Sequence, residues 1–200
     1  MRISFRVGLL GWIVPLLYFF YEPFAIQASR VPYSYIAQPM SDLGVTVCGI
    51  GTYPWADYAI CSPHSSLVNV LFFVMAVCLL IGIISVYQRL SLASLGKFSF
   101  LLLVLFAIGN GFSAIPANIS FSWHTYPVMF MIFVAPALFV IASQIKQGKV
   151  FTYSMATSLL FIKLGIIVMV FFPVEIGGLL QRAFYFVFYC WGLGMMIKLK

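Results

Sequence analysis

The feature that most constrains the fold is a series of long apolar runs that recur along almost the whole chain. Each run is close to the ~20 residues that a helix needs to cross the hydrocarbon core of a membrane. Charged residues make up only 8% of the chain, whereas soluble domains carry about 25%. The sequence therefore predicts an all-α membrane protein, one domain over residues 1–200 with a bundle of six transmembrane helices. The expected spans are Val7–Ile26, Ser66–Tyr87, Phe98–Ile115, Tyr126–Ser143, Thr152–Phe172 and Gly178–Ile197.

The distribution of charge predicts the orientation of this bundle. One set of helix ends carries eight basic residues and no acid: Arg2, Arg6, Arg89, Lys97, Lys146, Lys149, Lys198 and Lys200. The opposite ends carry all four acids and only two bases: Glu22, Asp42, Asp57, Glu175, Arg30 and Arg182. Because basic loops stay on the cytoplasmic side, we expect both termini in the cytoplasm and a multi-pass protein of the cytoplasmic (inner) membrane.

Two other interpretations of the basic residues are set aside. The net charge of +7 does not indicate nucleic acid, because the bases lie at helix ends and not in a patch with interleaved aromatics. The expected partners are membrane lipids. The basic start and apolar run of the first span resemble a signal peptide, but no A-x-A-like cleavage site follows the run. We expect residues 7–26 to remain as the first helix.

The segment between the first two spans, residues 27–65, is the long first extracytoplasmic loop in this topology. Its most distinctive part, Gln38–Asn69, is neither strongly apolar nor basic. Proline and glycine punctuate it in the manner of turns, and its aromatic residues suit the headgroup layer of a membrane. These aromatic residues are Tyr33, Tyr35, Tyr53, Trp55 and Tyr58. We expect the loop to lie on the bundle as a lid, or to be partly re-entrant.

Two of the four cysteines, Cys48 and Cys61, belong to this loop. An oxidising compartment would allow them to pair, and such a loop closure contributes about 3 kcal/mol in the chain-entropy model. The alternative is two buried free thiols. A metal site is disfavoured, because the spacing of the two cysteines lacks the C-x₂₋₄-C signature. Cys78 and Cys190 lie within spans, where we expect them to pack as small apolar residues.

Lys163 stands near the middle of the fifth span, some ten residues from either end. Ionisable groups at that depth are costly in lipid and need a partner. The lysine either lines a cavity that accepts an anionic ligand, or is a structural group satisfied by helix carbonyls or by a polar group of another span.

Polar side chains from five segments are predicted at one depth, the outer third of the bilayer: Asp42, His64, Asn69, Asn110, His124, Glu175 and Arg182. A polar cluster at the mouth of a bundle is the default hypothesis for a ligand site, and with Lys163 these are the expected ligand-binding residues. Each has a simpler explanation: the amides as interhelical hydrogen bonds, the histidines as interfacial groups, and Arg182 as an ion pair with Glu175. Arg182 shares one helix face with Tyr185 and Tyr189.

Short motifs around these residues resemble the prokaryotic integral membrane family known as "domain of unknown function 998". In chain order they are Ser41-Asp42-Leu43-Gly44, Ser62-Pro63-His64 leading to Asn69, Gly109-Asn110-Gly111 running to Pro116, His124, and Gly177-Gly178 to Gln181-Arg182. The resemblance implies a six-helix bundle in a bacterial membrane and supplies no reaction. Gln181 stands where the family pattern would have an acid, which argues against a proton-transfer role at that position.

Three functions remain open on these residues. The first is the handling of a lipid or small amphipathic ligand in an outward-facing polar cleft, where Arg182 and Lys163 would favour an anionic headgroup. The second is a membrane-embedded enzyme acting on a lipid or envelope molecule. The third is a structural or immunity-type partner protein without a small ligand.

For the enzyme, the catalytic candidates are Asp42, His64 and His124. They could hold one divalent metal and leave a position for water, or a histidine could act as general base with Asp42 orienting it. Serines 41, 62 and 65 are possible nucleophiles, although the chain has no G-x-S-x-G elbow. It also lacks an H-E-x-x-H motif, a P-loop and a dinucleotide fingerprint.

Overall fold

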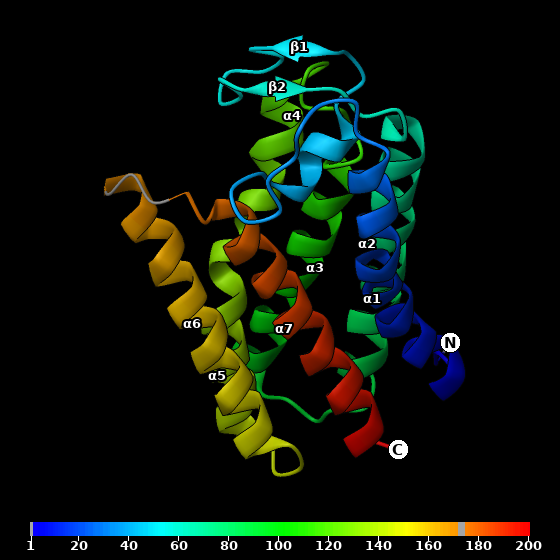
Figure 1. Cartoon of the computed structure of the whole chain (residues 1–200). Coiled ribbons are helices and arrows are strands. Elements are labelled where there is room, and N and C mark those ends of the chain that lie inside the picture. The colour runs from blue at the N-terminus through cyan, green and yellow to red at the C-terminus, as the bar shows by residue number, and fades with distance from the viewer. Residues whose placement is uncertain (1, 172–174) are drawn as a thin grey trace.

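The computed structural model describes residues 2–171 and 175–200, and the chain is mostly helical (Figure 1). Its α-helices are α1 (Phe5–Gln27), α2 (Ser65–Tyr87), α3 (Ser94–Phe112), α4 (Phe121–Thr125), α5 (Val134–Gln144), α6 (Lys149–Phe171) and α7 (Gly177–Lys198). Two 3₁₀ helices, η1 (Met40–Gly44) and η2 (Pro127–Phe133), and two strands, β1 (Gly49–Ile50) and β2 (Ala59–Ile60), complete the described elements. The strands pair antiparallel, with Gly49 opposite Ile60.

Several helices are long and apolar enough to cross a membrane, as predicted. Five such segments are found among the described residues: Phe5–Gln27, Ser65–Tyr87, Ser94–Phe112, Phe121–Gln144 and Lys149–Val168. They overlap the first five predicted spans, although Phe172, the expected end of the fifth, lies outside the described residues. Helix α7 is less apolar than these five segments, because it carries Gln181 and Arg182. Many of its side chains are buried against other parts of the protein.

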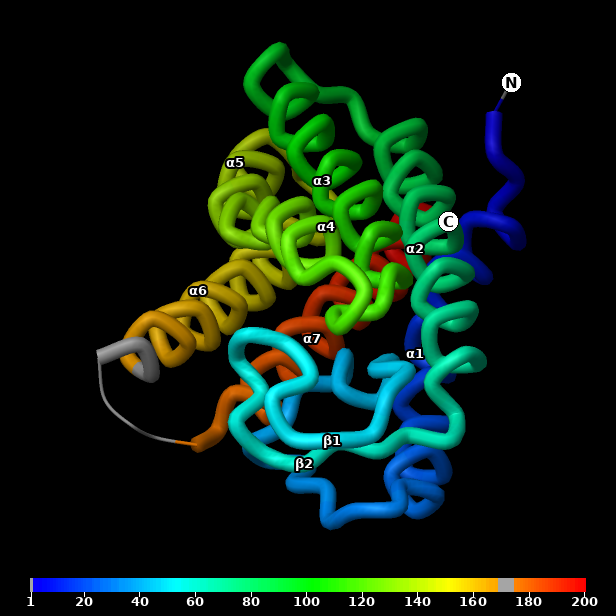
Figure 2. The backbone as a smooth tube through the Cα atoms, turned by 90° about the horizontal axis from the view of Figure 1, so that it is seen from above, coloured from blue at the N-terminus to red at the C-terminus, as the bar shows by residue number. Residues whose placement is uncertain are grey.

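The helices form a closed ring in chain order. Helix α1 packs against α2, α2 against α3, and α3 against both η2 and α5. Helix α5 then packs against α6, α6 against α7, and α7 against α1. Short connections make neighbouring helices antiparallel. The two chain ends therefore lie at the end of the bundle away from the β1–β2 hairpin (Figure 1). Seen from the hairpin end, the outer loop (residues 28–64, between α1 and α2) lies over α1 and α7 (Figure 2).

A buried tryptophan joins three of these helices at the centre of the bundle. Trp12 of α1 has no exposed surface and fits between Gly82 of α2 and Gly192 of α7. A Cβ atom added to Gly192 would lie 2.1 Å from the Trp12 ring, and one added to Gly82 would lie 2.8 Å away. Small residues at such positions allow membrane helices to approach closely, where packing and not the hydrophobic effect drives association.

The fourth predicted span, Tyr126–Ser143, is wrong as a single α-helix. It consists of α4, then the 3₁₀ helix η2, then α5. Pro127 opens η2, and a proline lacks the N–H that would continue the hydrogen-bond ladder of a helix. Lys163 of α6 donates to the Met131 carbonyl of η2, and its ammonium lies 5.6 Å above the Phe184 ring. These contacts agree with the second explanation given for Lys163, a structural lysine satisfied by a helix carbonyl.

Candidate functional site

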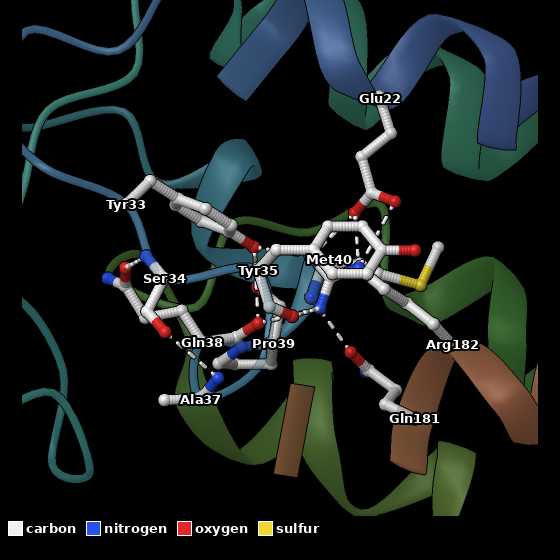
Figure 3. Close-up of polar contacts among 10 residues, drawn as sticks. All are labelled: Glu22, Tyr33, Ser34, Tyr35, Ala37, Gln38, Pro39, Met40, Gln181 and Arg182. Atoms are coloured by element: carbon white, nitrogen blue, oxygen red, sulfur yellow. Dashed lines mark hydrogen bonds and ion pairs between the residues drawn. The ribbon is translucent and has the colours of Figure 1, made fainter. Parts of the chain in front are cut away.

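A buried guanidinium holds the outer loop on the bundle (Figure 3). Arg182 of α7 pairs with Glu22 of α1 at 2.7 Å, and the two side chains are 2% and 1% exposed. The Arg182 Nη1 group donates to the carbonyls of Tyr35 at 2.9 Å and Gln38 at 2.8 Å. Its Nη2 group also donates to the Tyr33 hydroxyl at 2.7 Å. A guanidinium has five N–H donors, and these contacts with the Nε bond to Glu22 employ all of them.

The predicted pairing of Arg182 with Glu175 is therefore wrong. Glu175 precedes α7 and is exposed, so solvent satisfies it. Arg182 lies one turn inside the helix, where an unpaired charge would be costly, and only an acid that is buried with it can compensate. Glu22 near the end of α1 is that acid. Arg182 consequently anchors the loop and has no donor left for an anionic headgroup.

The first turn of α7 makes a second attachment to the loop. Gly178 N–H donates to the Ala37 carbonyl at 3.0 Å, and Leu179 N–H donates to the Ile36 carbonyl at 2.9 Å. These are helix-start donors that would otherwise lack a partner. A Cβ atom on Gly178 would lie 2.1 Å from the Gln38 carbonyl oxygen, so the approach requires glycine. One turn on, the Gln181 Oε1 atom accepts from Met40 N–H at 2.8 Å.

Asp42 is buried inside the loop, where two tyrosines bind it. The Tyr53 hydroxyl donates to its Oδ1 at 2.6 Å and the Tyr58 hydroxyl donates to its Oδ2 at 2.8 Å. Burial raises the pKa of Asp42 to about 6, although these hydrogen bonds and the charge of Arg182 oppose the rise. Burial and the neighbouring carboxylate also raise the pKa values of both tyrosines. Asp42 thus connects η1 to the β1–β2 hairpin.

The remaining loop contacts also involve predicted site residues. Cys48 and Cys61 form the predicted disulfide, which is confirmed. The Ser62 hydroxyl donates to the Leu43 carbonyl at 2.7 Å, and Asn69 Nδ2 donates to the Gly44 carbonyl at 2.8 Å. Both donors lie at the start of α2 or just before it, so they attach η1 to that helix.

Asp42, His64 and His124 are not brought together. His64 Nδ1 lies 3.0 Å from the Tyr21 hydroxyl, with the two rings stacked, while Asp42 bonds to the loop tyrosines. Among residues 2–171 and 175–200, no group of three His, Cys, Asp or Glu side chains is placed to hold a metal ion. The described geometry therefore gives no support to the divalent-metal hypothesis.

Beneath the loop lies a cavity with about 60 Å³ open to the centres of water-sized molecules. Since a water needs roughly 10–15 Å³ on this measure, the space holds a few waters or a small polar group. Residues from η1, α2, α3, α4, η2 and α7 surround it: Met40, Ser41, Phe72, Met75, Ala76, Asn110, Ser113, His124, Val128, Gln181, Tyr185 and Tyr189. Of the eight predicted ligand residues, Asn110 and His124 line this cavity.

The protein contacts of His124 determine which of its nitrogens is free. Its Nδ1 atom lies 2.7 Å from the Ile115 carbonyl oxygen. A carbonyl can only accept, so Nδ1 carries the proton. In the neutral imidazole, Nε2 is then a hydrogen-bond acceptor. His124 is only 9% exposed and lines the cavity, and its Nε2 atom has no hydrogen-bond partner among the described residues.

The other polar side chains of the cavity offer mainly donors. Asn110 Oδ1 accepts from the Tyr185 hydroxyl at 2.8 Å, and Gln181 Oε1 accepts from Met40 N–H. Among the described residues, the amide N–H groups of these two side chains have no hydrogen-bond partner. Tyr189 is 1% exposed and lines the cavity with no hydrogen bond to its hydroxyl among the described residues. The cavity lining contains no charged residue in the part of the chain that the structure describes.

Sequence reasoning missed several of these groups. The spacing of Arg182, Tyr185 and Tyr189 on one helix face was the signal for the α7 wall, and the structure shows that all three residues are buried. Ser41 was named only as one of three possible nucleophiles. Ser113 has no comparable signal, because serine is common and its position depends on how the end of α3 packs. Gln181 was noted only as a departure from a family pattern.

Comparisons of the chain with protein-family models, curated proteins and solved structures find no match. The family resemblance of the short motifs remains a prediction.

Proposed function

We propose that this multi-pass membrane protein binds the uncharged polar group of an amphipathic ligand in the cavity beneath its outer loop. The observation that carries the proposal is the lining: amide N–H groups of Asn110 and Gln181, the Tyr189 hydroxyl and the His124 Nε2 acceptor, set among apolar side chains. Ligand sites are typically apolar with a few convergent polar groups of this kind. An uncharged headgroup bearing hydroxyl or carbonyl oxygens fits this set.

The proposal includes a topology of six spans with both termini in the cytoplasm of a bacterial inner membrane. Six long helices in a closed ring support it, with α7 as the sixth. The basic flanks at the end that holds both termini agree with the positive-inside rule. The Cys48–Cys61 disulfide favours an oxidising compartment on the loop side.

The test is the identification of molecules retained by protein extracted in a mild detergent, by native mass spectrometry and by analysis of the organic extract. We expect wild type to retain a defined molecule, and His124→Phe and Tyr189→Phe to lose it. His64→Phe is the matched control, because His64 contacts Tyr21 outside the cavity. Size-exclusion profiles and thermal midpoints show which variants are folded, and Tyr189→Phe removes only a hydroxyl. Equal retention by all four proteins, or no retained molecule, would refute the proposal.

A second candidate is a membrane-embedded enzyme that uses His124 as general base. The observation that favours it is the hydrogen bond to Ile115, which fixes the tautomer and leaves Nε2 as acceptor in a cavity that also holds Ser41 and Ser113. A positioned histidine of this kind can accept a proton from a reacting hydroxyl. If the retained molecule is converted by wild type over time and not by His124→Gln, this candidate replaces simple binding.

A further inference from the structure

A predominantly apolar groove, lined by residues without polar side chains, runs down the outside of the bundle between α2 and α3. It measures about 480 Å³, and its walls include Phe73 and Val77 of α2 and Ile108 of α3, whose side chains are 57%, 43% and 47% exposed. The part of α2 that lines it extends from Phe73 to Leu80, about 10 Å at 1.5 Å per residue. In a membrane this surface faces hydrocarbon.

The groove and the polar cavity share a thin wall. Ala76 lines both spaces. At the end of α3, Ser113 lines the cavity while its neighbours Phe112 and Ala114 line the groove. Across from Ala76 stands Gly111, where an added Cβ atom would meet only the Ala76 methyl group, at 3.7 Å. Small residues therefore separate the two spaces where they come closest.

The Ile115 carbonyl makes a second connection between them. Ile115 lines the groove, and its carbonyl accepts the hydrogen bond that orients His124 in the cavity. The apolar surface and the polar groups are thus built from the same turn of chain.

The aqueous side of the cavity is covered. Met40 and Ser41 of η1 form part of the lining, and η1 is tied to the bundle by Gln181 and Asn69. The preceding loop residues are tied by the fully engaged Arg182. These hydrogen bonds hold the outer loop in place beside the cavity, whereas on the membrane side only small residues of α2 and α3 separate the cavity from the groove.

We propose that the ligand is a membrane lipid whose hydrocarbon chain lies in the α2–α3 groove while its uncharged headgroup occupies the cavity, so that it enters sideways from the bilayer. This inference rests on the proposed function and adds the substrate class and the route. The shared chemistry is an oxygen-bearing, uncharged headgroup on one hydrocarbon chain, which acylglycerols and isoprenoid alcohols both provide.

The probe is a monoacylglycerol with a diazirine in its chain, photolysed with the protein in phosphatidylcholine nanodiscs and mapped by tandem mass spectrometry. We expect saturable adducts within residues 73–80 and 107–115. Val77→Trp fills the groove and should reduce them at least tenfold. Val74→Trp is the matched control, since Val74 is 40% exposed on the same helix and lines neither space. His124→Phe should also reduce them at least tenfold.

The outcomes separate the two proposals. Saturable labelling that depends on His124 but is equal in Val77→Trp and Val74→Trp would overturn the groove and leave the cavity function standing. Labelling of the groove that neither saturates nor depends on His124 is ordinary lipid contact and would overturn both. Competition by unlabelled monoacylglycerol, a polyprenol or free glycerol identifies the source, and full competition by glycerol would overturn the requirement for a chain.

Discussion

Arg182 of α7 places its Nη2 atom 2.7 Å from Glu22 Oε1 of α1, and the two residues are 160 positions apart in the chain. The same guanidinium donates to two carbonyls of the outer loop. One buried ion pair therefore connects the first helix, the last helix and the loop that covers the cavity. Because both partners are nearly inaccessible to solvent, removing either one leaves an uncompensated buried charge.

Glu22→Ala is expected to destabilise the protein by about 3–5 kcal/mol, the range for breaking a buried pair. The measurement is unfolding in an SDS titration, with limited proteolysis of residues 28–64 as the readout of loop attachment. Glu175→Ala is the control, since Glu175 is exposed and should change stability by less than about 0.5 kcal/mol. Equal stability of the two variants would contradict the assignment of Glu22 as the partner.

Asp42 makes stability depend on pH. Its pKa rises from an ordinary 3.8 to about 6 in the folded protein, so between these values the folded state binds a proton that the unfolded state has lost. The stabilising contribution of the Asp42 carboxyl to the unfolding free energy is therefore fully present below about pH 4. It is lost as the pH rises to about 6, and the loss is roughly 3 kcal/mol at 1.36 kcal/mol per pKa unit.

Asp42→Asn should remove this fall, because the amide does not titrate. The measurement is the difference in unfolding free energy between wild type and variant at pH 4, 5, 6 and 7. Asp57→Asn is the control, since Asp57 is exposed and that variant should follow wild type. A wild-type curve parallel to that of Asp42→Asn over this range would show that the carboxyl ionises in place without cost.

The sequence correctly predicted a mostly helical chain with several helices long enough to cross a membrane. Apolar runs of membrane length must become helices, because lipid offers no partner for free backbone groups. The sequence did not predict the break in the fourth span. Pro127 is visible in the sequence, but the 3₁₀ turns after it depend on packing against α3.

The common depth of the polar residues in the membrane stays a prediction, and the separate roles of these residues were not visible in the sequence. Asn110 and His124 line the cavity, whereas Asp42, Asn69 and Arg182 hold the loop. The sequence predicted the loop tyrosines at the headgroup layer but did not predict their partners: Tyr33, Tyr53 and Tyr58 donate hydrogen bonds within the loop, and Tyr33 also accepts one from Arg182. Partners so far apart in the chain leave no local pattern.

The disulfide should contribute about 3 kcal/mol, the value for a loop of this length in the chain-entropy model. Cys48→Ser/Cys61→Ser should lose that amount in an SDS titration, while Cys78→Ala, which changes a free thiol, should lose less. In a Cys78→Ala/Cys190→Ala background, a membrane-impermeant maleimide should label intact cells only after reduction. Labelling that requires cell lysis would contradict the proposed orientation.

A variant of Lys163 tests whether this lysine is structural or binds the ligand. Its ammonium donates to the Met131 carbonyl and lies above the Phe184 ring, and it does not line the cavity. Lys163→Met keeps most of the side-chain volume and removes the charge, so we expect retention of the bound molecule within twofold of wild type. Stability should fall by at most about 3 kcal/mol, because a hydrogen bond to a charged group contributes about 1.5–3 kcal/mol. Native mass spectrometry measures retention, with His124→Phe as the variant that should lose the molecule. If Lys163→Met lost it while keeping its thermal midpoint, the ammonium would belong to the binding site.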